Sequence, residues 1–139
     1  MNFGKLNFIA GSVGLLLAAM GGMALGATFD EHSIQDGNHL LTEVRFYLRE
    51  GHSHGMPMAL LNLIFALYID RIGLSNLWKK IGSIAALLTF FLPIGLAAKG
   101  AAGAPADFPP IGIVGIVGFF VAAGVLAAGA FTMKREATS

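Results

Sequence analysis

The sequence contains no cysteine and few charged residues. Without cysteine, the chain cannot form disulfides, thiolate metal sites, iron–sulfur clusters or a cysteine nucleophile. Charged residues make up 12% of its 139 residues and apolar residues 55%, whereas a soluble domain is typically about 25% charged. So few charges could not cover so apolar a core in water, which excludes a typical soluble enzyme. The net charge of +1 gives no reason to expect a nucleic-acid partner.

Sequence motifs of several enzyme classes are absent too. The chain has no phosphate-binding P-loop, no GxSxG nucleophile motif and no HExxH zinc motif. Its apolar runs contain no pair of carboxylates for acid–base chemistry. The sequence therefore carries no signature of these reaction mechanisms.

Apolar residues are concentrated in four long runs. A helix needs about 20 mainly apolar residues to cross a bilayer, and the runs approach that length: residues 6–27, 55–72, 81–98 and 111–133. No separate soluble domain and no internal repeat is visible between them. The sequence therefore predicts an all-α fold, a four-transmembrane-helix bundle that forms one integral membrane domain over residues 1–139 and lies in membrane lipid.

Lysine and arginine residues predict the orientation of this bundle. Six of them fall at the N-terminus, in the second connection and at the C-terminus: Lys5, Arg71, Lys79, Lys80, Lys134 and Arg135. Three fall in the first and third connections: Arg45, Arg49 and Lys99. Because short loops rich in positive charge stay in the cytoplasm, we expect a multi-pass protein with both termini cytoplasmic.

The connection between the first two runs contains an amphipathic segment, residues 39–50. Its apolar residues recur with the spacing of one helical face: Leu40, Leu41, Val44, Tyr47 and Leu48. Charged residues occupy other positions of the segment. This pattern predicts an amphipathic helix that lies in the membrane interface between the first and second spans.

Small residues form stripes along the first and fourth runs. Those of the first run are spaced four residues apart: Ala10, Gly14, Ala18, Gly22 and Gly26. Such stripes let helices approach each other closely, or they leave room for a flat ligand. In the third run, Pro93 predicts a kink or an opening onto a cavity.

The densest group of chemically active side chains is the segment Gly51–Met58. Pro57 fits the first turn of a helix, which would place His52 and His54 just above the second span. Two residues on a helix are separated by about 200° of rotation, so one flat ligand cannot use both histidines. Asn62 lies two turns deeper, roughly on the face of His54, and must face protein, water or a ligand.

Three interpretations of this segment stay open. The histidines can be hydrated interface residues that bind nothing. One imidazole can be the axial ligand of a haem between small-residue helix faces. Alternatively, imidazole and thioether groups together suit Cu(I), and four methionines lie near the same end as the histidines: Met20, Met23, Met56 and Met58.

Several short motifs match a known pattern along most of the chain. His54 precedes Pro57 by three residues at the start of the second span, and Asn62 follows. Asp70–Arg71 and Lys79–Gly82 flank the next turn. In these features the chain resembles the styrene oxide isomerase family, small four-span membrane proteins that bind haem b and assemble as trimers.

The resemblance implies haem b as the cofactor, with ferric haem acting as a Lewis acid that rearranges an apolar epoxide to a carbonyl compound. It also implies a homo-oligomer, specifically a trimer. It makes His54 the haem ligand and Asn62 the substrate-facing residue. The family's third span carries an aspartate, a tryptophan and a tyrosine, whereas residues 87–96 contain none of these.

We therefore predict a haem b-binding integral membrane protein, which isomerises an apolar epoxide if it is catalytic. The residues expected at the haem are His54 as axial ligand, His52 as the alternative ligand, and Met58, Gly22 and Gly26 around them, with Asn62 as the catalytic residue. The alternative is a non-enzymatic haem- or copper-binding subunit of a larger membrane assembly.

Overall fold

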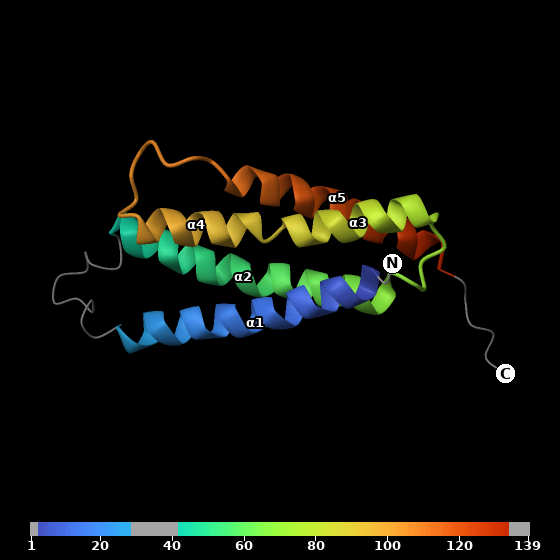
Figure 1. The fold of residues 1–139 in the computed structure, drawn as a ribbon, viewed down its shortest axis with the longest axis horizontal. Coiled ribbons are helices and arrows are strands. Elements are labelled where there is room, and N and C mark those ends of the chain that lie inside the picture. Colours follow the sequence, from blue (N-terminus) through green and yellow to red (C-terminus); the bar gives the residue numbers. More distant parts are fainter. Residues whose placement is uncertain (1–2, 29–41, 134–139) are drawn as a thin grey trace.

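The computed structural model describes residues 3–28 and 42–133. These residues form five helices and no strand (Figure 1): α1 (Phe3–Ala27), α2 (Glu43–Tyr68), α3 (Asn76–Leu88), α4 (Phe91–Ala101) and α5 (Gly112–Phe131). The all-α fold class is therefore confirmed. Positions 134 and 135, which contribute to the predicted orientation, lie outside the described residues.

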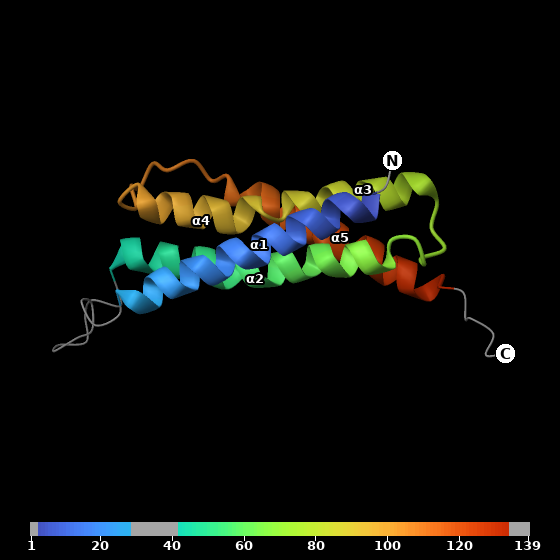
Figure 2. The same cartoon turned by 60° about the horizontal axis from the view of Figure 1, so that its bottom comes forward.

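The helices pack as an elongated bundle. α1 and α2 run antiparallel and lie side by side, while α3 and α4 follow one another as a single broken rod (Figures 1 and 2). α5 returns along α3. As a result, the start of α1, the turn between α2 and α3 and the end of α5 lie at one end of the bundle, and the end of α1 and the start of α2 lie at the other.

Three stretches are long and apolar enough to cross a membrane: Gly4–Ala27, Asn76–Ala101 and Gly112–Phe131. Large hydrophobic side chains on α1 and α5 are exposed, including Leu17 and Phe120, as expected for helices that face lipid. The chain therefore has transmembrane helices by length and composition. α2 is less apolar, because its first half carries four charged residues and two histidines.

The segment that predicts an interfacial helix has a different position in the structure. Residues 43–50 are the first turns of α2, which continues from there without a break. Gly100 of α4 packs directly against them, since an added Cβ would lie 2.9 Å from atoms of both Val44 and Leu48. Part of the apolar face of this segment therefore contacts protein, while Val44 stays 38% exposed. It forms no separate helix over residues 43–50, and residues 39–41 lie outside the described part.

The two prolines in the apolar helices have different effects. Pro57 lies inside α2, which begins at Glu43, so its predicted place in a first helical turn is wrong. α2 continues past it, as membrane helices can, and both histidines lie within the helix. Pro93 lies in the first turn of α4 and has no N–H, and the Thr89 carbonyl accepts instead from the Leu92 N–H at 3.1 Å. The predicted kink is confirmed as the break between α3 and α4.

Small residues allow close helix packing at Gly118 in the fourth run and at Gly11, which lies beside the predicted stripe of the first run rather than in it. An added Cβ at Gly11 would lie 2.8 Å from the Ala59 carbonyl oxygen, and one at Gly118 would lie 2.7 Å from the Ala85 carbonyl oxygen. Both distances are too short for a real contact. Because glycine has no side chain at these positions, α1 packs closely on α2 and α5 packs closely on α3. Both contacts lie within one chain.

Hydrophobic side chains fill the space between α2, α3 and α5. Phe65 is fully buried at the centre of this group. The cluster contains Phe65, Ile69, Ile72, Ala85, Ala86, Ala122 and Val125. The cluster lies toward the end of the bundle where α1 starts. None of its members lies in the half where α1 ends.

Candidate functional site

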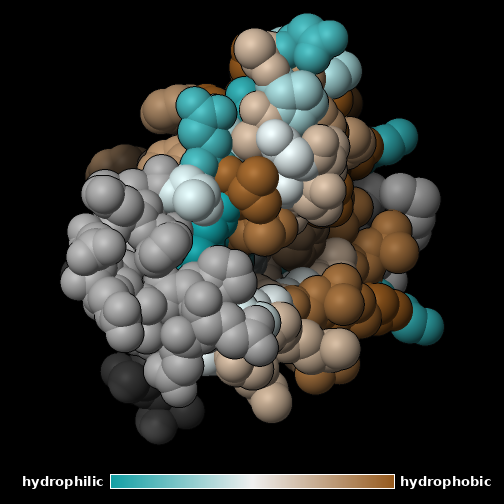
Figure 3. Space-filling view, turned by 90° about the vertical axis from the view of Figure 1, so that its left-hand side faces the viewer, coloured by the Kyte–Doolittle hydropathy of each residue, from teal (hydrophilic) through white to brown (hydrophobic). Residues whose placement is uncertain are grey.

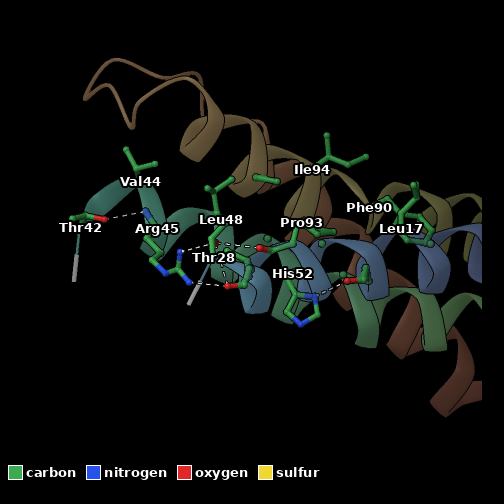
Figure 4. A pocket seen from close by; sticks show the side chains of 18 residues that line it. Leu17, Thr28, Thr42, Val44, Arg45, Leu48, His52, Phe90, Pro93 and Ile94 are labelled. Atoms are coloured by element: carbon green, nitrogen blue, oxygen red, sulfur yellow. Dashed lines mark hydrogen bonds between the residues drawn. The ribbon is translucent and has the colours of Figure 1, made fainter. Parts of the chain in front are cut away.

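A cavity of about 560 Å³ lies between α1, α2 and α4, in the half of the bundle where α1 ends (Figure 4). Its volume falls within the range of about 300–1,000 Å³ that is usual for small-molecule sites. Apolar side chains and glycines provide most of its lining, including Leu17, Leu48, Phe90, Ile94, Gly14 and Gly21. Pro93 also lines it, so the predicted opening beside this proline is confirmed.

His52 lines this cavity from α2. Its Nδ1 lies 2.7 Å from the carbonyl oxygen of Ala18 on α1. Because a carbonyl only accepts, Nδ1 carries the hydrogen, and Nε2 keeps the lone pair of the neutral ring. The ring lies against Gly22, where an added Cβ would be 2.9 Å from Nε2. A hydrogen bond from one ring nitrogen is how proteins commonly orient a histidine whose other nitrogen binds a metal.

The end of the cavity is polar, at the place where α1 ends and α2 begins. The Arg45 guanidinium donates to the Leu25 carbonyl at 2.8 Å and to the Thr28 hydroxyl at 3.2 Å. These bonds stabilise the last turn of α1, whose carbonyls have no partner within the helix. Thr42 caps the start of α2 and lines the same end of the cavity. In Figure 3 this end of the molecule faces the viewer, and hydrophilic residues gather there beside a hydrophobic flank.

His54 does not line the cavity. Its Nδ1 lies 2.9 Å from the carbonyl oxygen of Glu50, one turn earlier in α2, and 3.6 Å from a carboxylate oxygen of the same residue. The His54 side chain is 39% exposed. The structure thus brings the alternative ligand His52, rather than His54, to the cavity.

Asn62 is fully buried, and both its amide oxygen and its amide nitrogen form hydrogen bonds with protein groups. Its amide oxygen accepts from the Asn7 amide at 2.8 Å, and its nitrogen donates to the carbonyls of Met58 at 2.9 Å and Ala86 at 2.8 Å. Asn62 does not line the cavity. These contacts favour a structural role for the amide that the sequence predicts to face substrate.

Other polar side chains extend this arrangement across three helices. The Asn7 amide also donates to the Ser83 carbonyl at 3.1 Å, and the Ser83 hydroxyl donates to the Asn7 amide oxygen. The Thr89 hydroxyl donates to the Ala86 carbonyl at 2.6 Å. All of these side chains are buried, and we call the group the polar cluster: Asn7, Asn62, Ser83 and Thr89.

The remaining predicted site residues are distributed unevenly. Gly22 contacts the His52 ring, whereas Gly26 is exposed and has nothing within 4 Å of an added Cβ. Met58 is buried and does not line the cavity. Met20 and Met23 are exposed on α1, whereas Met58 is buried, so these thioethers of the predicted copper site do not share one environment. Within residues 3–28 and 42–133, no three histidines or carboxylates come together as a metal site.

Sequence reasoning missed Arg45, Thr28 and Phe90 as cavity residues. Arg45 did leave a signal, since it precedes His52 by seven residues and therefore lies on nearly the same face of α2. Thr28 and Phe90 reach the cavity through the packing of α1 and α4 on α2, and no local pattern points to them.

Comparison with known proteins finds no matching family model, no matching curated protein and no matching solved structure. The resemblance to the styrene oxide isomerases therefore stays a prediction from the sequence.

Proposed function

We propose that this chain is a four-span membrane protein that binds haem b in the cavity between α1, α2 and α4, with His52 as the axial ligand. One observation carries the proposal. The His52 imidazole is oriented by the Ala18 carbonyl and lies in an apolar, glycine-lined cavity. When bound, haem b supplies a Lewis-acidic iron to the site.

The residues of the cavity fit this group in three respects. The apolar lining suits a macrocycle, and Gly21 on α1 leaves open space beside it, since nothing lies within 4 Å of an added Cβ there. The hydrogen bond from Nδ1 holds the His52 ring in place, and Nε2, which lies beside Gly22, is the nitrogen left for the iron, as expected of an axial histidine. The polar end, with Arg45 and two threonines, suits the carboxylate edge of haem b.

The choice of ligand differs from the sequence prediction, which favours His54. His54 bonds to its own helix and lies on another face of α2. A ligand bound there would be outside the cavity of a single chain. We therefore assign the iron to His52 and use His54 as the comparison.

We further propose that α2 is the fourth span. It packs against α1 and α4, and its 26 residues match the 25 of α1, so both helices reach the same depth. The end where α1 starts carries Lys5, Arg71, Lys79 and Lys80 among the described residues, and the other end carries Arg45, Arg49 and Lys99. This excess favours a cytoplasmic location for the former end, and hence for both termini.

The trimer and the isomerase activity rest on the resemblance alone. An apolar groove between α3 and α5 is a surface on which a second copy can pack. Among the described residues that line the cavity there is no carboxylate and no tyrosine. Haem binding is thus the function proposed, and conversion of an apolar epoxide is tested by adding one to the haem-loaded protein. A non-enzymatic haem-binding subunit is the second candidate, favoured by the same lack of acid groups.

The test is a haem titration of the purified full chain in mild detergent, followed by its Soret absorbance. We expect His52→Ala to lose most haem, because the iron loses its nitrogen donor, and His54→Ala to retain it. Added imidazole should restore the absorbance of His52→Ala. If only His54→Ala lost haem, the iron ligand would be His54, on the face of α2 outside the cavity. Full absorbance in both variants, or none in the unaltered chain, would refute haem ligation by this segment, and copper analysis would then test the alternative.

A further inference from the structure

Two side chains of α2 reach across to backbone carbonyls of α1 with the same spacing. His52 contacts the carbonyl of Ala18, and Arg45 contacts that of Leu25. The two α2 residues are seven apart, and so are the two α1 residues, as antiparallel helices require. Seven residues correspond to about 10.5 Å along a helix and to nearly the same face. Arg45 and His52 therefore line one side of the cavity, two turns apart (Figure 4).

Arg45 is half-buried and pairs with no acid among the described residues. There an ion pair joins Arg49 to Glu50, and the His54 ring lies 3.6 Å from the Glu50 carboxylate. Within the described part of the chain the Arg45 guanidinium bonds to a carbonyl and a hydroxyl, both neutral. A partly buried cation beside an apolar cavity is stabilised most by an anion, and the fork of a guanidinium matches a carboxylate.

We propose that the polar end of the cavity is a carboxylate site, in which Arg45 binds the acid group of the occupant with the Thr28 and Thr42 hydroxyls beside it. A guanidinium has five N–H donors, so Arg45 can hold a carboxylate while it keeps its contacts with α1. The occupant then has an apolar body near His52 and a carboxylate at one edge. The inference rests on the proposed function for the identity of that occupant, haem b with its two propionates.

The experiment compares an acid with its ester. Haem b and haem b dimethyl ester have the same macrocycle, but the ester lacks the carboxylate charges. Each is titrated into the full chain in detergent and followed by absorbance. We expect the unaltered chain to bind the acid about 10–100-fold more tightly than the ester, the range for a hydrogen bond to a charged group.

Three variants make this comparison specific. Arg45→Met should bind acid and ester alike, and Arg45→Lys should keep part of the preference because its charge stays but its fork is lost. Arg49→Met removes the same charge one turn further along α2, where the side chain is exposed and pairs with Glu50, and should keep the full preference. Because each comparison is a ratio within one variant, a general loss of stability cancels.

A second pair of probes separates the carboxylate site from haem as its occupant. A fluorescent long-chain fatty acid and its methyl ester are titrated in the same way. A chain that binds no haem but prefers the fatty acid in an Arg45-dependent manner keeps the carboxylate site and overturns the haem proposal. An unaltered chain that binds haem and its ester equally overturns the carboxylate site and leaves haem binding standing. An acid preference that survives in Arg45→Met also overturns the role of Arg45.

Discussion

The two halves of the bundle use the same helices, α1 and α2, but join them differently. In the half where α1 starts, which we call the sealed half, side chains bond to each other, as Asn7 does to Asn62. Backbones touch there, and Gly11 has no room for a Cβ. In the other half, the cavity half, side chains of α2 bond to carbonyls of α1, and nothing lies within 4 Å of an added Cβ at Gly21.

This difference separates residues that hold the fold from residues that can bind a ligand. In the polar cluster each buried amide is used up by protein partners, and no buried side-chain nitrogen or oxygen in the described residues lacks one. An imidazole or a guanidinium that bonds to a carbonyl still has a second nitrogen or further donors. The buried Asn62 amide therefore has protein partners on both its oxygen and its nitrogen, whereas His52 and Arg45 keep binding capacity.

The largest effect is expected from placing the same methyl group in each half of α1. Gly11→Ala should lower the free energy of unfolding by about 1–3 kcal/mol, because the added carbon collides with the Ala59 carbonyl. Gly21→Ala should raise it by up to about 1 kcal/mol, because alanine favours helix and the space is open. Unfolding in mixed detergent micelles measures both. Equal effects of the two substitutions would contradict the division into halves.

A smaller loss is expected when the polar cluster loses its central amide. Asn62→Leu keeps the volume and should lower the free energy of unfolding by about 1–2 kcal/mol, within the range for buried and intramembrane hydrogen bonds. Haem affinity should not change, because Asn62 does not line the cavity.

The control for this substitution is its bonded partner on α1. Asn7→Leu should cost a similar amount, and the double variant should cost less than the sum, since both remove one shared hydrogen bond. A stable Asn62→Leu protein with weakened ligand binding would instead restore the substrate-facing role that the resemblance implies.

Local patterns in the sequence were sufficient for the helices. Apolar runs of about 20 residues marked α1, α5 and the rod of α3 and α4. Pro93 marked the break between α3 and α4, because the loss of its N–H acts within one turn. The beginning of α2 was missed for a physical reason. A charged amphipathic segment looks the same whether its apolar face meets lipid or a second helix, and Gly100, which covers it, lies about 50 residues away.

The site was harder to predict because its contacts join distant segments. Asn62 looked ligand-facing, as an amide within an apolar run must have partners, but Asn7, which supplies one, lies 55 residues away. His52 and His54 looked equivalent until α1 was placed beside α2. Only then did the Ala18 carbonyl and Gly22 distinguish the two rings. The chemistry of the segment was thus readable from the sequence, but the choice of residue required the packing.

The smallest effect concerns the outer end of the cavity half. The Lys99 ammonium of α4 lies 4.4 Å from the centre of the Tyr47 ring on α2, and neither residue is fully buried. A cation–π contact of this kind contributes about 0.5–1 kcal/mol at exposed sites. Lys99 also lies in the last turn of α4, where a positive charge stabilises the helix dipole, so Lys99→Met alone would mix two effects.

A double-mutant cycle of Lys99→Met and Tyr47→Leu isolates the contact, because the dipole contribution is the same with either residue at position 47. We expect a coupling of about 0.5 kcal/mol in the free energy of unfolding, below the loss expected for Asn62→Leu. The Lys99 ammonium and the Tyr47 ring are partly exposed. The Asn62 amide, in contrast, is buried and joins α2 to α1 and α3 by hydrogen bonds. A coupling larger than the Asn62 effect would mean that the cavity half is held as firmly as the sealed half. The open space beside α1 would then be a rigid feature of the fold, and the contrast between the halves would lie in shape rather than in stability.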